Sequence, residues 1–187
     1  MAATLVVNAF FYNVKVLSED SIKKLQSLIL DESEKNLHDA FSINVIALFL
    51  MAKEFLPAMV KNDHRRIITI ANLASYITEI QNVDYACSKV SALVFHEGLT
   101  QELRHCYKVL RVRTGIVHPG YIRAPLVAKI LDQSKLKAYL LEPEVVIDSI
   151  VKQILSGKSG EVFLPGPFCG CGCKKGAASV ATRNSSQ

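Results

Sequence analysis

The chain has 187 residues, of which 50% are hydrophobic and 21% charged, an ordinary composition for a globular protein with a single core. Its net charge of +5 is mild and its lysines and arginines are scattered, so nucleic acid is not expected as a partner. The first residues lack the basic segment and the long apolar run of a signal peptide.

The most apolar stretch, residues 43–60, contains Lys53 and Glu54 and is short for a bilayer, which argues against a transmembrane segment. We therefore expect an intracellular protein, either cytoplasmic or peripherally associated with lipid membranes. In that setting all five cysteines would stay reduced.

Apolar strands alternate with amphipathic helices along most of the chain. The first strand is predicted over residues 4–9, and helices over residues 18–30 and 31–59 follow, because apolar residues recur there at helical spacing. The later elements are predicted in the order strand 67–71, helix 85–105, strand 109–117, two short helices in 124–139, helix 144–155 and strand 161–164. This alternation predicts an α/β fold with a parallel sheet covered by helices on both faces.

Periodicity ends near residue 168, where Gly, Ser, Ala and Lys begin to dominate. We therefore predict one domain over residues 1–167 and a disordered tail over residues 168–187. The tail holds Cys169, Cys171 and Cys173, which are spaced too tightly for an ordinary four-ligand zinc site, and no metal site is predicted. These thiols, which precede two lysines, could instead be acylated or bind a soft metal.

Tyr85 and Lys89 lie four residues apart in the predicted helix 85–105 and therefore share one helix face. The ammonium favours the phenolate, so it would lower the pKa of Tyr85 from about 10 toward the working pH. Such a tyrosine can act as general acid and base on an alcohol or a carbonyl oxygen. The alternative is a solvated Tyr–Lys pair on a helix surface. The flanking residues distinguish this alternative from a catalytic pair.

Motifs on both sides of this pair point to one family. Upstream, Asn44 lies in the long helix and Asn72 follows an apolar strand; downstream, the strand 109–117 runs into His118-Pro119-Gly120. In order and spacing these residues resemble the short-chain dehydrogenase/reductase family. The tract 118–126 is similar to the branch that acts on hydroxysteroids, retinol and other lipid-like alcohols. The resemblance covers roughly residues 3–165.

The resemblance implies a Rossmann-like, doubly wound parallel sheet that lacks its first three strands in this chain. The family begins with a strand and a glycine-rich turn whose amides hold the cofactor pyrophosphate, whereas the first glycine here is Gly98. We therefore expect an N-terminally truncated domain, most simply explained by a gene model that misses its front part. Residues 4–9 would then form an open apolar edge of the sheet.

Four catalytic residues are implied by the resemblance. Tyr85 would be the acid/base, Lys89 would bond the nicotinamide ribose, and Asn44 would hold a water that links Lys89 to solvent. Asn72 stands where the family has its catalytic serine, and its NH2 group can donate to a substrate oxygen although its size and geometry differ from those of a hydroxyl. Ser75 is a possible substitute, and weak or altered chemistry is expected.

NAD or NADP is the implied cofactor, and the choice between them stays open because the residues that read the ribose 2′ position belong to the missing segment. The implied contacts come from Asn8, Ala9, Tyr85, Lys89, Pro119, Gly120 and Ile122. Phe10 replaces a family glycine, and Ala124 replaces a threonine that usually bonds the carboxamide. Both departures weaken the expected cofactor site.

Two functions remain open. The first is NAD(P)-dependent hydride transfer between the nicotinamide and a small-molecule secondary alcohol or ketone of lipid-like character, with Tyr85 as acid/base. The second is a non-catalytic remnant that pairs with a relative or a second copy through the helices 34–60 and 85–105, which the family uses for dimerisation. The missing glycine turn and Asn72 favour the second, so autonomous turnover is not expected. The substrate itself is not identified.

Overall fold

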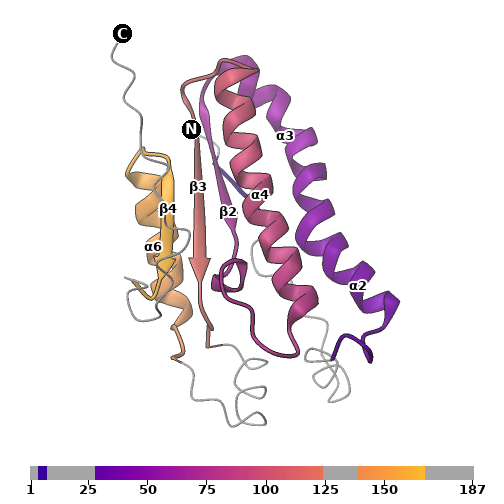
Figure 1. Ribbon diagram of the computed structural model, residues 1–187. Coiled ribbons are helices and arrows are strands. Elements are labelled where there is room, and N and C mark those ends of the chain that lie inside the picture. Colours follow the sequence, from indigo (N-terminus) through magenta and orange to yellow (C-terminus); the bar gives the residue numbers. More distant parts are fainter. Residues whose placement is uncertain (1–3, 8–27, 124–138, 167–187) are drawn as a thin grey trace.

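The computed structural model describes residues 4–7, 28–123 and 139–166, which form one sheet with helices on both of its faces (Figure 1). The strands are β1 (Thr4–Val7), β2 (Arg65–Ile70), β3 (Val112–Pro119) and β4 (Gly160–Leu164). All neighbours pair in parallel, and the order across the sheet is β1-β2-β3-β4. The predicted α/β fold with a parallel sheet is confirmed, and β1 lies at an edge of the described sheet.

Helical segments connect these strands. Helix α2 (Glu34–Phe41), the π-helical segment η1 (Ser42–Ile46) and helix α3 (Ala47–Asn62) follow one another without a break and precede β2. The 3-10 segment η2 (Leu73–Ser75) and helix α4 (Val83–His105) lie between β2 and β3, and helix α6 (Pro143–Leu155) precedes β4.

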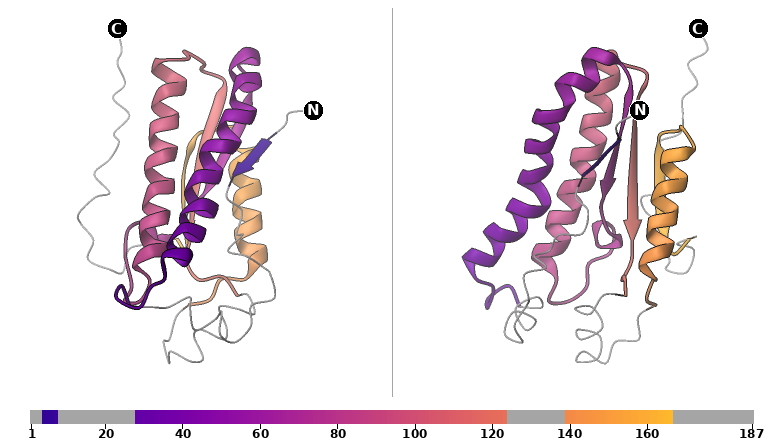
Figure 2. Two further views of the ribbon diagram at one scale, coloured as in Figure 1. Left: turned by 90° about the vertical axis from the view of Figure 1, so that its right-hand side faces the viewer. Right: turned by 180° about the vertical axis from the view of Figure 1, so that it is seen from behind.

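The alternation of side chains along β2 decides which helices cover which face. Ile67 packs with residues of α3 and α4, whereas Ile68 and Ile70 pack against α6. Successive side chains of a strand point to opposite faces, so α3 and α4 lie on one side of the sheet and α6 on the other. Figure 1 and the right-hand view of Figure 2 show α6 on one side of the strands and α3 and α4 on the other.

The predicted helix 31–59 is confirmed with shifted ends. It begins at Glu34 because Ser33 caps it, accepting a hydrogen bond from the Asn36 amide at 3.1 Å. It ends at Asn62, where Asp63 adopts a left-handed conformation with φ 43°. The sequence pattern therefore located the helix to within one turn at each end.

The predicted strand 109–117 and the predicted helix 18–30 need correction. Strand β3 begins only at Val112, after Lys108 has turned the chain with φ 55°, and it runs on to Pro119, which pairs with Leu164. Residues 28–31 contain a turn, so no helix reaches Leu30. The rest of that helix, the two helices predicted in 124–139 and the tail 168–187 lie outside the described residues, apart from Tyr139, which is not helical.

The helix over Glu34–Asn62 is long and apolar enough to cross a membrane by length and composition, and only 17% of its most apolar window is buried. Its exposed side chains include Phe49, Leu50 and Phe55, and Val94 of α4 is exposed as well. The absence of a transmembrane segment therefore stays a prediction.

Candidate active site

The carboxyl ends of β2 and β3 lie at the same end of the sheet as the first turn of α4 (Figure 1). Strand β2 continues into Asn72, β3 continues into Gly120, and Tyr85 lies in the first turn of α4. The Ala71 amide donates to the Val117 carbonyl at 2.9 Å, which joins the two strand ends. Ligands of open parallel sheets bind at this end, so the fold directs the predicted catalytic residues to one region.

Tyr85 and Lys89 face each other as their spacing predicts. The Lys89 ammonium lies 5.5 Å from the centre of the Tyr85 ring, a cation–π distance. The Lys89 side chain is only 4% exposed, and this burial lowers its pKa from 10.5 to about 8 because water no longer solvates the charge. Such a lysine can change its charge near physiological pH.

Asn44 is held against the helix that carries this pair. It lies in the π-helical segment η1, is 2% exposed, and donates from Nδ2 to the Ser88 hydroxyl at 3.0 Å. Ser88 in turn donates to the Tyr85 carbonyl at 2.7 Å. The wider π turn is often found at functional sites. Asn44 was predicted as a site residue, whereas Ser88 was not, and its position next to Lys89 was the available signal in the sequence.

Within the described residues, the Asn72 side chain uses only part of its hydrogen-bonding capacity. Its Oδ1 accepts from the Ala74 amide at 2.9 Å and so caps η2, which leaves the NH2 group as the donor for another partner. Ser75, the possible substitute, is buried and donates to the Lys89 carbonyl at 3.0 Å. The Ser75 hydroxyl is therefore engaged with the backbone of α4, and Asn72 is the better candidate.

The predicted cofactor contacts are described only in part. The Gly120 amide donates to the Leu164 carbonyl at 2.7 Å, and Pro119 is buried at the end of β3. Ile122 is 9% exposed and forms an isolated β-bridge with Leu141. It belongs to a small apolar cluster with Leu141 and Val146. Asn8 and Ala9 lie outside the described residues.

A polar and aromatic cluster that the sequence analysis missed adjoins these residues. His118 is completely buried; its Nδ1 lies 3.4 Å from the Asn72 carbonyl, and its Nε2 lies 2.7 Å from Oε1 of Glu161. The Tyr76 hydroxyl donates to the same Oε1 at 2.6 Å. The His118 ring is stacked on Phe163, with centroids 4.9 Å apart. A histidine directly before the Pro-Gly turn was the only signal in the sequence.

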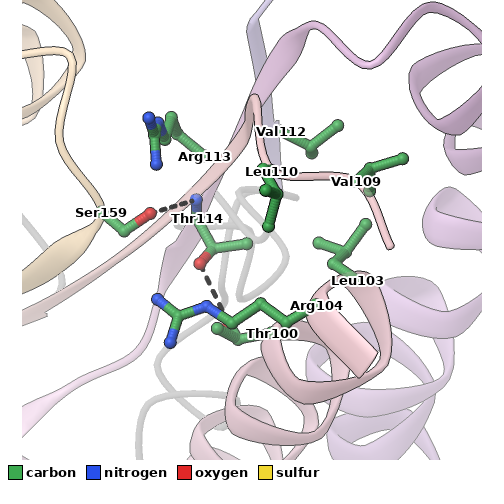
Figure 3. A pocket seen from close by; sticks show the side chains of 9 residues that line it. All are labelled: Thr100, Leu103, Arg104, Val109, Leu110, Val112, Arg113, Thr114 and Ser159. Carbon is green, nitrogen blue, oxygen red and sulfur yellow. Dashed lines mark hydrogen bonds between the residues drawn. The ribbon is translucent and has the colours of Figure 1, made fainter. Parts of the chain in front are cut away.

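A separate cavity of about 370 Å³ lies at the opposite end of α4, next to Leu103 and Arg104 (Figure 3). The Thr114 amide donates to the Ser159 hydroxyl at 3.2 Å, and Thr100 donates to the Thr114 hydroxyl at 3.0 Å. These polar groups bond one another at the amino end of β3. The cavity is therefore not part of the candidate active site.

The fold and the Tyr–Lys pair define a Rossmann-like α/β protein with the arrangement of a dehydrogenase. The sequence model of the family described as short chain dehydrogenase matches residues 5–135, so the chain belongs to that family. Dehydrogenase RED3 of Cochliobolus heterostrophus is 43% identical over 86 residues, 46% of this chain and 44% of that protein. Human estradiol 17-beta-dehydrogenase 11 is 29% identical over 159 residues, 85% of this chain and 51% of that protein.

Solved structures show the same fold. A short chain dehydrogenase/reductase family protein superposes with a TM-score of 0.66 at 21% identity, and the match covers 86% of this chain and 64% of that one. Acetoin dehydrogenase from Enterobacter cloacae gives a TM-score of 0.64 at 15% identity, with coverages of 86% and 62%. The chain spans about half the length of the curated relatives it matches. Their names fit the predicted resemblance to the hydroxysteroid branch.

Proposed function

We propose that this chain is part of an NAD(P)-dependent oxidoreductase that interconverts a secondary alcohol and a ketone, with Tyr85 as the acid/base. The observation that carries the proposal is the buried Lys89 ammonium beside the Tyr85 ring at 5.5 Å. Family membership supports the same reaction class, because short-chain dehydrogenases generally bind NAD or NADP.

The described residues fit the nicotinamide ribose. The Lys89 ammonium has no hydrogen-bond acceptor or carboxylate partner among the described residues, so its donors are available to ribose hydroxyls. The cofactor, when bound, supplies the hydride acceptor or donor. Pro119 and Gly120 would lie beside its nicotinamide ring.

Each side chain then has a separate task in the proposed reaction. In alcohol oxidation Tyr85, as phenolate, takes the hydroxyl proton, and Lys89 stabilises that phenolate by its charge. The NH2 group of Asn72 donates to the substrate oxygen in place of the family's serine. Asn44, bonded to Ser88, holds the helix turns around Lys89 in register and would orient the water that returns the proton to solvent.

For the substrate we propose a lipid-like secondary alcohol or ketone. The names of relatives support this, since human estradiol 17-beta-dehydrogenase 11 is similar over 85% of this chain. By resemblance to the family, residues 124–139 would form the variable segment over the substrate, and they lie outside the described residues except for Tyr139. Leu126, Val127 and Ile130 in that segment are apolar, which would suit such a substrate and would equally suit a helix that packs on the core.

Turnover tests this proposal. The purified chain is assayed with NAD⁺ and NADP⁺ against estradiol and a series of 2-alkanols, and the reduced nicotinamide is followed by fluorescence. Tyr85→Phe should lower kcat about 10²- to 10⁴-fold, the usual contribution of general acid–base catalysis. Tyr107→Phe, an exposed tyrosine beyond the far end of α4, is the matched control and should keep full activity. Equal rates for wild type and Tyr85→Phe would contradict the proposal.

A second candidate function is pairing with a relative or a second copy through the helices 34–60 and 85–105. The exposed apolar side chains on α3 and α4 support it, since Phe49, Leu50 and Val94 are 51%, 61% and 59% exposed. Light scattering after size exclusion should find dimers in the wild type and monomers in Leu50→Glu. A wild-type monomer at micromolar concentration would contradict this function.

A further inference from the structure

The protons on the buried His118 ring follow from its two partners. The Asn72 carbonyl at 3.4 Å can only accept, so Nδ1 has to carry a proton. Oε1 of Glu161 at 2.7 Å already accepts from the Tyr76 hydroxyl and is likewise an acceptor, so Nε2 has to carry one as well. The Nε2 contact is an ion pair rather than a well-aligned hydrogen bond, since Nε2 meets no hydrogen-bond geometry within the described residues. A bare Nε2 at 2.7 Å from a carboxylate oxygen would be repelled, so the two contacts together fit an imidazolium.

The groups around His118 suit a positive charge. The contact with His118 lowers the pKa of the Glu161 carboxyl, against the opposing effect of burial. Burial, together with the charge of His118, lowers the pKa of His96 on α4 to about 4, so His96 is neutral near pH 7. Burial and the bond to Glu161 raise the pKa of Tyr76, which stays a phenol, and Glu97 of α4 adds to this through its charge. Glu161 is thus the one carboxylate paired with His118 in the described part of the chain.

The cluster joins three segments that end at the candidate active site. His118 precedes the Pro119-Gly120 turn of β3, Tyr76 caps the end of η2, which begins beside Asn72, and Glu161 lies on β4. Phe163 of β4 stacks on the His118 ring at an interplanar angle of 16° and excludes water from it. A movement of the ring would therefore move the Asn72 backbone and the turn together.

We propose that the His118 imidazolium, paired with Glu161, is a positioning device that sets the place of Asn72 and of the Pro119-Gly120 turn. His118 and Glu161 are assigned no step of the proposed reaction and would act through Asn72 and the turn, so both are positioning residues. The inference rests on the proposed function for its effect on turnover. The coupling between the His118 ring and Asn72 does not depend on turnover and can be measured alone.

The first test is a long-range ¹H–¹⁵N spectrum of the folded, labelled full chain. Both His118 nitrogens should be protonated, whereas His96 should be neutral and serves as the internal reference. A single neutral His118 tautomer in the wild type would overturn the proposal.

Two variants distinguish the effect of the His118–Glu161 ion pair from the effect of the side chains packed around it. Glu161→Gln removes the carboxylate, so one His118 nitrogen should lose its proton and the side-chain amide signals of Asn72 should shift from their wild-type positions. Asn72 signals that stay fixed when the His118 ring changes would overturn the proposal. Tyr76→Phe removes the other bond to Glu161 and should leave both nitrogens protonated. In turnover at pH 6, Glu161→Gln should lose about 10- to 100-fold in kcat/KM through misplacement of Asn72, and Tyr76→Phe much less. A wild type without turnover would contradict the proposed function, and the spectra would still decide on the positioning device.

Discussion

Asn44 donates its side-chain amide to the Ser88 hydroxyl at 3.0 Å, which joins the π-helical segment η1 to the turn of α4 that carries Lys89. Both side chains are buried, with exposures of 2% and 0%. Because Ser88 also donates to the Tyr85 carbonyl, the two segments form one hydrogen-bonded unit around the proposed catalytic pair. The bond thus gives Asn44 a structural role in addition to its proposed part in proton transfer.

Asn44→Ala should lower the free energy of unfolding by about 1–3 kcal/mol, because it removes a buried donor and leaves the Ser88 hydroxyl with one bond fewer. Urea unfolding of both proteins measures the difference. Asn62→Ala is the control, since its amide donates to the Ala58 carbonyl at an exposed helix end. If Asn44→Ala cost no more than Asn62→Ala, the buried bond would not hold the two segments together.

Lys89 should make stability depend on pH at the alkaline end. Its folded pKa of about 8 lies below the ordinary 10.5, so between these values the unfolded state binds more protons and stability rises with pH. The gain should approach roughly 3 kcal/mol, at about 1.4 kcal/mol for each pKa unit. The difference in unfolding free energy between wild type and Lys89→Met should therefore change over that pH window. A difference that stays constant from pH 8 to pH 10.5 would contradict the burial of the Lys89 charge.

Two glycines should respond to alanine in opposite directions. A Cβ at Gly98 of α4 meets nothing within 4 Å, so Gly98→Ala should stabilise the chain by about 0.5–1 kcal/mol through helix propensity. A Cβ at Gly115 of β3 would lie 2.9 Å from Cδ1 of Ile68, so Gly115→Ala should destabilise by about 1–3 kcal/mol. Thermal unfolding gives both signs, and a destabilised Gly98→Ala would mean that a partner covers this face of α4.

Asn72→Ser should raise kcat/KM, because it restores the hydroxyl that the family has at this position. A serine can also accept from the Ala74 amide, as Asn72 does at 2.9 Å, so η2 should keep its cap. The expected gain is up to about 10²-fold, the order of one transition-state donor. Steady-state kinetics would contradict this reading if Asn72→Ser were slower than the wild type while its stability was unchanged.

The parts of the site that depend on local geometry could be predicted. Tyr85 and Lys89 face each other because four residues make about one helical turn. Asn72, by contrast, was singled out by the resemblance to the family, since it stands at the position of the family's serine. The contacts that join distant segments could not be predicted. His118 and Glu161 meet only because β3 and β4 pair, and no local pattern assigns a partner to either residue. The π turn at Asn44 likewise shows no signature in a continuous helical pattern.

The boundaries that were wrong have the same origin. Residues 109–111 are apolar or amphipathic enough to continue a strand, but Lys108 turns the chain with its positive φ. The Arg111 amide donates to Oδ1 of Asp63 at 2.8 Å instead of pairing with a strand. Pro119 was expected in a turn, yet it completes the pairing with Leu164. Local propensity was overruled here by contacts between segments far apart in the chain.

Calorimetric titration of NADH and NADPH into the purified chain and into Lys89→Met tests the proposed oxidoreductase function. We expect saturable binding of one of them at micromolar concentration to the wild type, and binding at least tenfold weaker to Lys89→Met, since the ribose loses its buried ammonium donor. A folded wild type that binds neither cofactor would contradict the oxidoreductase function for this polypeptide and favour the pairing function instead.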